Sequence, residues 1–269
     1  METKHEKKYA IVTGASSGLG KQIACDLAIK HGYSLILIAR REKRLLAVKE
    51  YILSRAQVEI VSIPSDLSDT DSLDVLVGKL DILPNIRVAV LAAGVTYFGE
   101  LEKQNNSNIE SINALNISAN LKLIQWSSQY FQTHNQGGNI VIISSMAALI
   151  PTPYQAVYSA SKAYISNLVK GLSQENKENN IFYTLVYPIG MKTEMTASNQ
   201  LNSILEKNRL STISVEKCSE SCIQAMFKNK KTVIPGLVGK TIYFLSLILP
   251  SSILLSYTAS LYKKSLDEE

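Results

Sequence analysis

Cysteine and histidine are scarce in this sequence, with three of each among 269 residues. Cys25, Cys218 and Cys222 are odd in number and lack CxxC spacing, which argues against a disulfide framework and predicts a reduced, cytoplasmic protein. Cys218 and Cys222 stand one helical turn apart, but two thiols are too few ligands for a structural metal, so we expect ordinary helix packing there. The sequence therefore predicts no metal site.

Three other features are missing as well. Residues 1–8 are polar and lack the hydrophobic core of a signal peptide, so we do not expect export. The net charge of +5 is scattered rather than gathered into a basic stripe with aromatics, which argues against a nucleic-acid partner. The three histidines, His5, His31 and His134, lie in the tail or near predicted helix ends, so a Ser-His-Asp hydrolase has no motif to support it.

The sequence does contain a regular alternation of short apolar runs and longer helical patterns. Each short run is continuously apolar, as in strands that are buried on both faces of a parallel sheet. The predicted strands are residues 9–13, 34–39, 58–63, 88–92, 139–144 and 181–187, and the predicted helices are 20–30, 42–55, 109–131 and 154–176. This order predicts an α/β fold with a single doubly wound parallel sheet, Rossmann-like, and a C-terminal helical extension.

No repeat or Pro/Gly-rich linker divides this pattern, so we expect one catalytic domain at residues 9–239 after a polar tail at 1–8. The irregular segment at about 190–213 follows a predicted strand at the edge where such sheets bind ligands, and it is a candidate substrate loop. Residues 240–269 form the apolar extension.

The extension carries no charge between Lys240 and Lys263. A membrane-spanning helix needs about 20 apolar residues, and Pro250 and the serines around it favour two shorter amphipathic helices instead. Three interpretations stay open, in order of preference: packing or dimerisation, peripheral membrane contact through residues 241–262, and a true span. We also expect a homo-oligomer.

A glycine-rich segment, Thr13 to Gly20, joins the first predicted strand to the first predicted helix. Glycines let backbone N–H groups approach a pyrophosphate, and the helix that follows offers the positive end of its dipole to that anion. A segment of this kind between a strand and a helix is typical of a dinucleotide site. Its candidate cofactor-binding residues are Gly14, Ser16, Ser17, Gly18, Leu19 and Gly20.

The second predicted strand ends in Arg40 and Arg41, where NAD-binding proteins usually carry an acidic residue. A guanidinium can bind the 2′-phosphate of NADP through charge-assisted hydrogen bonds, so the pair favours NADP(H). We expect one of the two arginines to bind the cofactor and the other to be a surface residue.

Tyr158 and Lys162 stand four residues apart on a predicted helix, so both side chains leave the same face. A neighbouring ammonium favours the phenolate and turns the tyrosine into a usable acid or base. Ser144 and Ser145 end a predicted strand at the carboxyl edge of the sheet, where a hydroxyl can hydrogen-bond a substrate oxygen. Together these residues predict proton transfer at a carbonyl or alcohol group.

Over roughly residues 8–235 these motifs resemble the short-chain dehydrogenase/reductase family. The positions that carry the resemblance, beside the glycine-rich segment, are Asp66, Leu67, Ala93, Gly94, Asn116, Ser145, Tyr158, Lys162, Pro188 and Thr193. The resemblance implies that Ser145 positions the carbonyl and that Tyr158 transfers the proton. It further implies that Lys162 lowers the pKa of Tyr158 and holds the nicotinamide ribose, while Asn116 keeps a water in a proton relay behind the lysine.

The resemblance also implies cofactor contacts outside the glycine-rich segment. Asp66 would bind near the adenine, and the backbone from Ile189 to Thr193 would meet the nicotinamide carboxamide. The chain departs from the family's pattern in two places. Ala92 and Ala93 follow Leu91 where the family usually has two asparagines and an alanine, so the hydrogen bonds of those amides are lost or replaced. Ile189 stands where a glycine commonly follows the proline, which would shift the nicotinamide contacts.

The sequence thus predicts an NADP(H)-dependent oxidoreductase that interconverts a carbonyl and an alcohol. A non-catalytic NADP(H)-binding sensor or scaffold stays open as an alternative, although the set of Asn116, Ser145, Tyr158 and Lys162 weighs against it. If the extension contacts a membrane, a lipid-derived ketone becomes the favoured substrate. No motif in the sequence fixes the direction of the reaction or the substrate.

Overall fold

The computed structural model describes residues 7–83, 85–134, 137–197, 199–207 and 212–266, so residues 1–6 of the predicted polar tail and part of the predicted substrate loop lie outside the described residues. Seven strands form one parallel sheet in the order β3-β2-β1-β4-β5-β6-β7. The strands are β1 (Tyr9–Thr13), β2 (Ser34–Ala39), β3 (Ile60–Pro64), β4 (Ile86–Leu91), β5 (Gly138–Ile143), β6 (Ile181–Val186) and β7 (Thr232–Val233). The chain begins in the middle of the sheet and winds outward in both directions, which confirms the predicted fold class.

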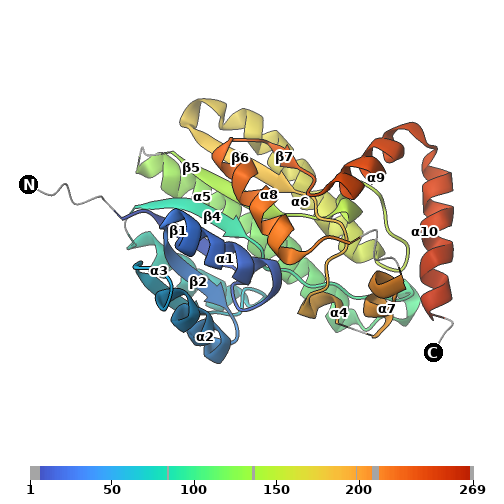
Figure 1. The fold of residues 1–269 in the computed structure, drawn as a ribbon, viewed down its shortest axis with the longest axis horizontal. Helices are drawn as coiled ribbons and strands as arrows, with labels where there is room; N and C mark the ends of the chain where they lie inside the picture. Colours follow the sequence, from blue (N-terminus) through green and yellow to red (C-terminus); the bar gives the residue numbers. More distant parts are fainter. Residues whose placement is uncertain (1–6, 84, 135–136, 198, 208–211, 267–269) are drawn as a thin grey trace, which may run out of the picture.

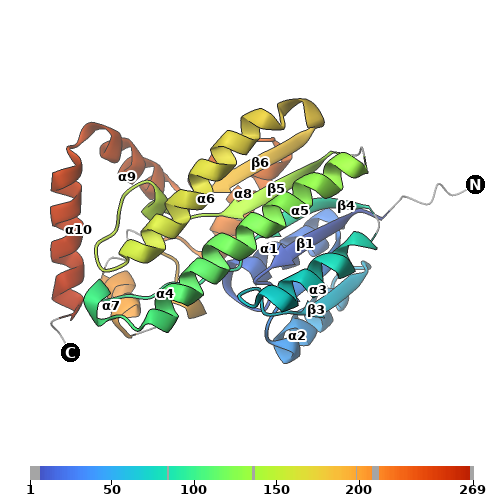
Figure 2. The same cartoon turned by 180° about the vertical axis from the view of Figure 1, so that it is seen from behind.

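Helices cover both faces of the sheet, as Figures 1 and 2 show from opposite sides. One face carries α1 (Gly18–His31), α2 (Glu42–Leu53) and α8 (Val215–Phe227), and the other carries α3 (Thr70–Asp81), α5 (Asn120–Thr133) and α6 (Ala156–Glu175). The remaining α-helices gather beyond the carboxyl ends of the strands and are α4 (Asn106–Ile112), α7 (Asn199–Lys207), α9 (Leu237–Ile248) and α10 (Ser251–Leu266). The carboxyl ends of the strands are therefore covered by these additional helices.

Alternating side chains of each strand build two apolar layers. In β1, Ala10 and Val12 pack in the layer with α1, α2 and α8, whereas Ile11 packs in the layer with α3, α5 and α6. All three are almost completely buried. Because both faces of the sheet are covered, most strand positions are buried, and this explains why the strands are mostly apolar in sequence.

The structure differs from the predicted elements in a few places. The predicted helix over 109–131 is one continuous run of α4, a π-helical turn at Asn113–Ala119 and α5. The edge strand β7 has only two residues, which is too short to leave a periodic pattern in the sequence. The extension forms two helices, α9 and α10, and in the described part of the chain no helix is long and apolar enough to cross a membrane.

Candidate active site

The glycine-rich segment turns tightly from β1 into α1. Gly14 and Gly18 have φ of +66° and +54°, a conformation that favours glycine. A Cβ atom built on Gly20 would lie 2.5 Å from the carbonyl oxygen of Gly14, so the segment closes on itself and has no room for a side chain there. Ser17 precedes α1 but makes no side-chain capping bond to it, which leaves the N–H groups of the first helical turn free of a side-chain cap.

Arg41 reaches from the end of β2 to this segment. Its guanidinium donates hydrogen bonds to the hydroxyls of Ser16 and Ser17, at 3.2 and 3.1 Å. It also forms an ion pair with Glu194 at 2.7 Å, and Arg44 contacts the same carboxylate. The hydrogen bond from Arg41 holds the pKa of Glu194 below its usual value, so the carboxylate is charged at neutral pH. A carboxylate thus sits between two arginines beside the glycine-rich segment.

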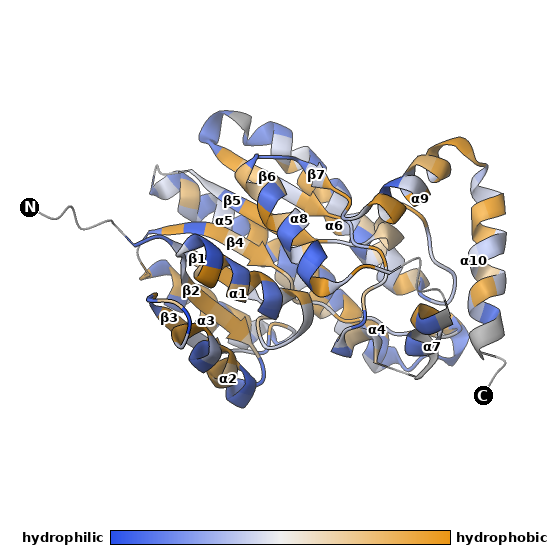
Figure 3. Cartoon of the chain, viewed as in Figure 1, coloured by the Kyte–Doolittle hydropathy of each residue, from blue (hydrophilic) through white to orange (hydrophobic). Residues whose placement is uncertain are grey.

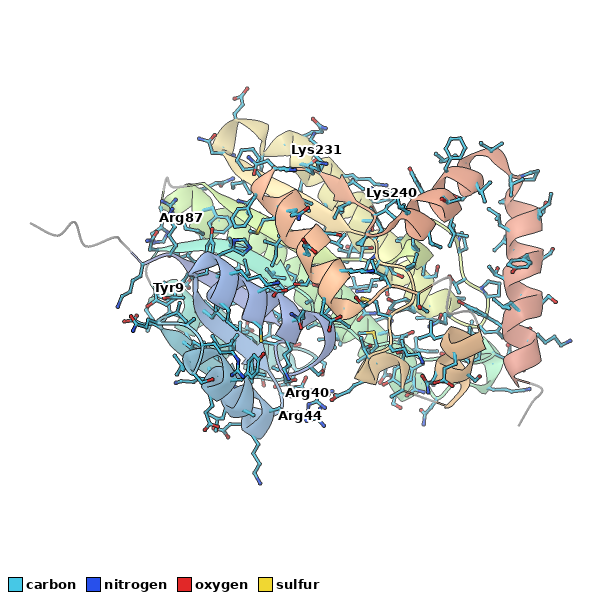
Figure 4. All side chains as sticks on the ribbon, viewed as in Figure 1. Tyr9, Arg40, Arg44, Arg87, Lys231 and Lys240 are labelled. Atoms are coloured by element: carbon cyan, nitrogen blue, oxygen red, sulfur yellow. The ribbon has the colours of Figure 1, made fainter. Side chains whose placement is uncertain are left out.

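Arg40 takes a different partner from its neighbour. Its guanidinium lies 3.7 Å from the carboxylate of Asp66, which follows β3 and accepts hydrogen bonds from the N–H and hydroxyl of Ser68. Burial raises the pKa of Asp66, but the bonds from Ser68 and the charge of Arg40 outweigh it, and the net pKa is lowered. Figure 4 shows Arg40 and Arg44 next to each other beyond the end of β2. Leu67, by contrast, is 5% exposed and packs in the core.

Tyr158 and Ser145 meet at the carboxyl edge of the sheet. Ser145 follows β5, and its hydroxyl oxygen accepts a hydrogen bond from the N–H of Ala147 at 3.1 Å, which fixes its position. Tyr158 lies in the first turn of α6. Burial raises the pKa of Tyr158, and a hydrogen bond with Ser145 partly offsets this. The phenol is therefore protonated at neutral pH, as a proton donor must be.

Lys162 leaves the same face of α6 one turn later. Its Nζ lies 5.8 Å from the centre of the Tyr158 ring and donates a hydrogen bond to the carbonyl oxygen of Ile143 at 3.0 Å. The residue is 6% exposed, and burial lowers the pKa of Lys162 to about 8. For Tyr158, burial is the largest influence on the pKa, and it raises the pKa. The resemblance implies that Lys162 lowers the pKa of Tyr158, and that effect stays a prediction.

Asn116 lies in the π-helical turn between α4 and α5 and is completely buried. Its side-chain amide exchanges two hydrogen bonds with the backbone of Val95, both at 2.9 Å, and donates a third to Ser161. A Cβ atom built on Gly94 would lie 3.1 Å from Oδ1 of Asn116 and 3.3 Å from Nζ of Lys162. Asn116 therefore holds the loop after β4 against Lys162, and its role in a water relay stays a prediction.

The two departures from the family's pattern have structural counterparts. The hydroxyl oxygen of Thr13 accepts hydrogen bonds from the N–H groups of Ala92 and Ala93 at 3.0 and 3.1 Å, so backbone bonds tie the loop after β4 to the end of β1. Ile189 is 9% exposed and turns its side chain toward α9, where a Cβ atom built on Gly239 would lie 3.2 Å from it. The isoleucine thus packs into the core that supports the extension.

The structure brings the predicted residues of the glycine-rich segment, the loop after β4 and the Pro188–Thr193 segment to one edge. Pro188 is buried, and its carbonyl oxygen accepts a hydrogen bond from the N–H of Met146 next to Ser145. Thr193 lies against Gly18, because a Cβ atom built on that glycine would be 3.5 Å from the threonine side chain. Leu19 is 7% exposed, so its side chain packs in the core and only its backbone faces the turn.

Two residues of this edge had no sequence signal that could find them. Glu194 meets Arg41 and Arg44 from a distant part of the chain. Tyr262, in α10, lies close enough to Tyr158 that its ionisation would raise the pKa of that phenol. Neither residue belongs to a motif, and only the folded chain brings them to the site.

The described residues fit a dinucleotide cofactor. Gly14 and Gly18 provide the tight turn, α1 presents uncapped N–H groups to an anion, and Arg41 adds a positive charge beside Ser16 and Ser17. Arg41 places a positive charge beside the glycine-rich segment, and this charge suits the 2′-phosphate that distinguishes NADP(H) from NAD(H).

Comparison with known proteins gives consistent matches. The sequence profile of the family described as short chain dehydrogenase matches residues 8–203. A very-long-chain 3-oxoacyl-CoA reductase of Meyerozyma guilliermondii is 30% identical over 221 residues, which cover 77% of this chain and 60% of that protein. An 11-beta-hydroxysteroid dehydrogenase-like 2 protein of Arabidopsis thaliana is 29% identical over 272 aligned residues, which cover 96% of this chain and 83% of that protein.

Among solved structures, a short-chain dehydrogenase from Sphingobium yanoikuyae in complex with NADPH superimposes with a TM-score of 0.79. The two sequences are 25% identical, and the match covers 86% of this chain and 88% of that one. The similarity therefore extends over the sheet and its helices and not over a motif alone.

Proposed function

Because the chain belongs to the short-chain dehydrogenase family, we propose that it uses NADP(H) to interconvert a ketone and an alcohol, with Tyr158 as the proton donor or acceptor. The chain is an oxidoreductase of this family. The observation that most directly supports the proposed proton transfer is the hydrogen bond between Tyr158 and Ser145, with the buried Lys162 one helical turn away. A non-catalytic binding protein has no need of such a set, so the alternative of a sensor or scaffold is less well supported.

In the proposed reduction, Ser145 and Tyr158 act on the carbonyl oxygen. The fixed hydroxyl of Ser145 donates a hydrogen bond to that oxygen, where negative charge develops. Tyr158 then transfers its phenolic proton to the oxygen, which gives the alcohol. Because the pKa of Tyr158 is raised by burial, the phenol is protonated at neutral pH and a proton is available for this transfer.

Lys162 and Arg41 hold the reactants in this proposal. A bound NADPH supplies the hydride that reduces the carbonyl carbon. Lys162, whose pKa of about 8 keeps a cationic form available at neutral pH, donates to the nicotinamide ribose and stabilises the tyrosinate that proton transfer leaves behind. Arg41 would hold the 2′-phosphate of the cofactor and would give up its ion pair with Glu194 to do so.

The names of the relatives support a bulky, lipid-derived ketone as the substrate class. One is a reductase of very-long-chain 3-oxoacyl-CoA and another is named for a hydroxysteroid. The first test is NADPH oxidation by the purified chain with ketones graded from small diketones to steroids and 3-ketoacyl thioesters. We expect turnover with the bulky ketones, and absence of turnover with every ketone and with the matching alcohols and NADP⁺ would contradict the proposal.

Cofactor preference provides a second test. Arg41→Ala should raise KM for NADPH about tenfold, since a charge-assisted contact to a phosphate is lost from a partly exposed site. KM for NADH should stay within about twofold, because that cofactor has no 2′-phosphate for the arginine to bind. Initial rates at varied cofactor concentration measure both values.

Lys43→Ala is the matched control, because Lys43 is an exposed cation two residues further along and the substitution removes the same charge. An equal loss of NADPH affinity in the Lys43 and Arg41 variants would indicate general electrostatics and not a phosphate contact. A wild-type preference for NADH would contradict the cofactor assignment.

We also propose that the tip of the α9–α10 hairpin rests on a lipid surface. The tip consists of large apolar residues that stay exposed, namely Phe244, Leu247, Ile248, Leu249 and Ile253. Figure 3 shows this hairpin as an apolar projection at one end of the molecule. At the base of α9, Ile242 and Tyr243 pack on the core, so packing within the chain accounts for the base and not for the tip.

Charge favours lipid over a second copy of the chain as the occupant of this surface. The stretch between Lys240 and Lys263 contains no charged residue, and a lysine stands at each end of it. Cations that flank an apolar segment suit the anionic head groups of a membrane. Figure 4 places Lys240 at the start of α9, where the hairpin leaves the body of the molecule. A lipid-bound tip would bring the active site near lipid-derived ketones.

Sedimentation with vesicles of phosphatidylcholine, with and without phosphatidylserine, tests the lipid proposal. Leu247→Asp should weaken binding about tenfold or more, because each buried leucine contributes roughly 1.5–3 kcal/mol. Val75→Asp is the control, since Val75 is 59% exposed on α3, on another part of the surface. The lipid proposal would be overturned if the wild-type protein sedimented with neither vesicle type. It would also be overturned if the wild-type protein were a dimer that Leu247→Asp dissociates.

A further inference from the structure

The last helix of the chain lies over the active-site end of the sheet. α10 contacts α7, and Figures 1 and 2 show both helices beyond the carboxyl ends of the strands. The ring of Tyr262 meets the ring of Phe98, which belongs to the loop after β4, edge to face with 5.6 Å between centres. The hairpin is therefore anchored at its far end to a loop that also carries Gly94 and Val95.

A second aromatic contact continues this one toward the catalytic helix. Phe98 lies 6.1 Å from Tyr154, ring centre to ring centre. The N–H of Gly99 donates a hydrogen bond to the carbonyl oxygen of Tyr154 at 2.9 Å, so the two loops are joined by their backbones as well. Tyr154 lies just before α6, whose first turn carries Tyr158. The three rings of Tyr262, Phe98 and Tyr154, which we call the aromatic wall, thus follow one another beside the catalytic phenol.

The position of Tyr262 on α10 is directed inward. Burial raises the pKa of Tyr262, and its ionisation would raise the pKa of Tyr158, so the two phenols interact electrostatically. Tyr257 on the same helix is 66% exposed instead. One helix therefore has an inner face that meets the site and an outer face that meets solvent.

We propose that Tyr262 is a specificity-determining residue, and that the aromatic wall it completes selects bulky, largely apolar ketones over small ones. This inference rests on the proposed function, because it names the substrate class of the same site. Aromatic rings supply a large apolar surface at fixed geometry, and a substrate gains from it only if it extends beyond the reacting carbonyl. A small ketone held by Ser145 and Tyr158 would gain little from the wall, because it ends near the reacting carbonyl.

The test compares two variants of Tyr262 on two ketones. Tyr262→Ala should raise KM for a steroid ketone about tenfold, through the loss of one ring from the aromatic wall, and leave kcat/KM for butane-2,3-dione within about twofold. Tyr262→Phe keeps the ring and should retain the low KM for the steroid. Tyr257→Ala is the matched control on the outer face and should change neither ketone.

Several outcomes would overturn the inference. If Tyr262→Ala changed kcat/KM equally for both ketones, the substitution would have disturbed the site in general. If it changed the kinetic constants for neither ketone, Tyr262 would not contact the substrate. Thermal unfolding of each variant separates a loss of folding from a loss of recognition. If Tyr262→Ala does not fold, Tyr262→Leu, which keeps an apolar side chain without the ring, takes its place.

Failure of the proposed function is distinguishable from failure of this inference. If the wild-type chain reduces no ketone, the proposed function fails first, and the inference is then decided by calorimetric binding of the steroid ketone to the NADP⁺-loaded wild-type protein. Binding that is weakened about tenfold by Tyr262→Ala, and unaffected by Tyr257→Ala, would still place Tyr262 in a pocket for bulky ketones. Absence of steroid binding to wild-type protein would refute it.

Discussion

Tyr158→Phe is expected to lower kcat for ketone reduction about 10³-fold, because the substitution removes the only atom that is proposed to transfer the proton. The ring stays in place, so KM for NADPH should change less than about twofold. NADPH oxidation, followed by absorbance with the best ketone of the graded panel, measures the loss in kcat, and NADPH titration measures cofactor binding in the same preparation.

Tyr164→Phe is the control for this substitution. Tyr164 lies on the same helix, is 48% exposed and points away from the core, so the loss of its hydroxyl should leave kcat unchanged. If Tyr158→Phe kept wild-type kcat, the proton would have to come from another group, and the assignment of Tyr158 as acid/base would be wrong.

Gly20→Ala is expected to disrupt the cofactor site. The added methyl would lie 2.5 Å from the carbonyl oxygen and 2.8 Å from the carbonyl carbon of Gly14, and both are backbone atoms that cannot rotate away. The whole segment has to move, and misplacement by about 1 Å can cost about 10²-fold in rate. We expect KM for NADPH to rise about 100-fold and the free energy of unfolding to fall by about 1–3 kcal/mol.

Gly78→Ala separates this steric effect from the general effect of replacing a glycine. Apart from the backbone of α3 itself and the two neighbouring residues, no described atom lies within 4 Å of a Cβ built on Gly78. There the substitution should leave KM unchanged and stabilise the protein by about 0.5–1 kcal/mol, because alanine loses less entropy than glycine in a helix. Cofactor titration and thermal unfolding measure both effects, and a Gly20→Ala variant with normal KM would argue against a pyrophosphate at this turn.

The predicted fold and most of the predicted site depend on short-range patterns. A strand buried on both faces must be apolar throughout, so β1, β2 and β6 are visible in the sequence within a residue of their ends. Tyr158 and Lys162 are one helical turn apart, so their shared direction follows from helix geometry alone. The turn at Gly14 to Gly20 is likewise a local feature, because a positive φ and close backbone approach are demands on single residues.

Other parts of the site depend on contacts that no local pattern encodes. The choice between Arg40 and Arg41 needs the positions of Asp66 and Glu194, which draw the two guanidinium groups in different directions. The direction of the Tyr158 pKa depends on how deeply the phenol is buried, and burial is a property of the whole packed chain. The packing of the Ile189 side chain could not be predicted from the sequence either, because the glycine that it contacts, Gly239, lies in α9.

The sequence by itself determined the alternation of buried strands and helices, the glycine-rich turn and the tyrosine–lysine pair, since each follows from the conformation of neighbouring residues. Only the tertiary structure decided which arginine faces the glycine-rich segment, and only it brought Tyr262 over the catalytic edge. The reason is physical: the order of strands in the sheet and the packing of α10 are set by many weak contacts between distant segments, which act together only in the folded chain.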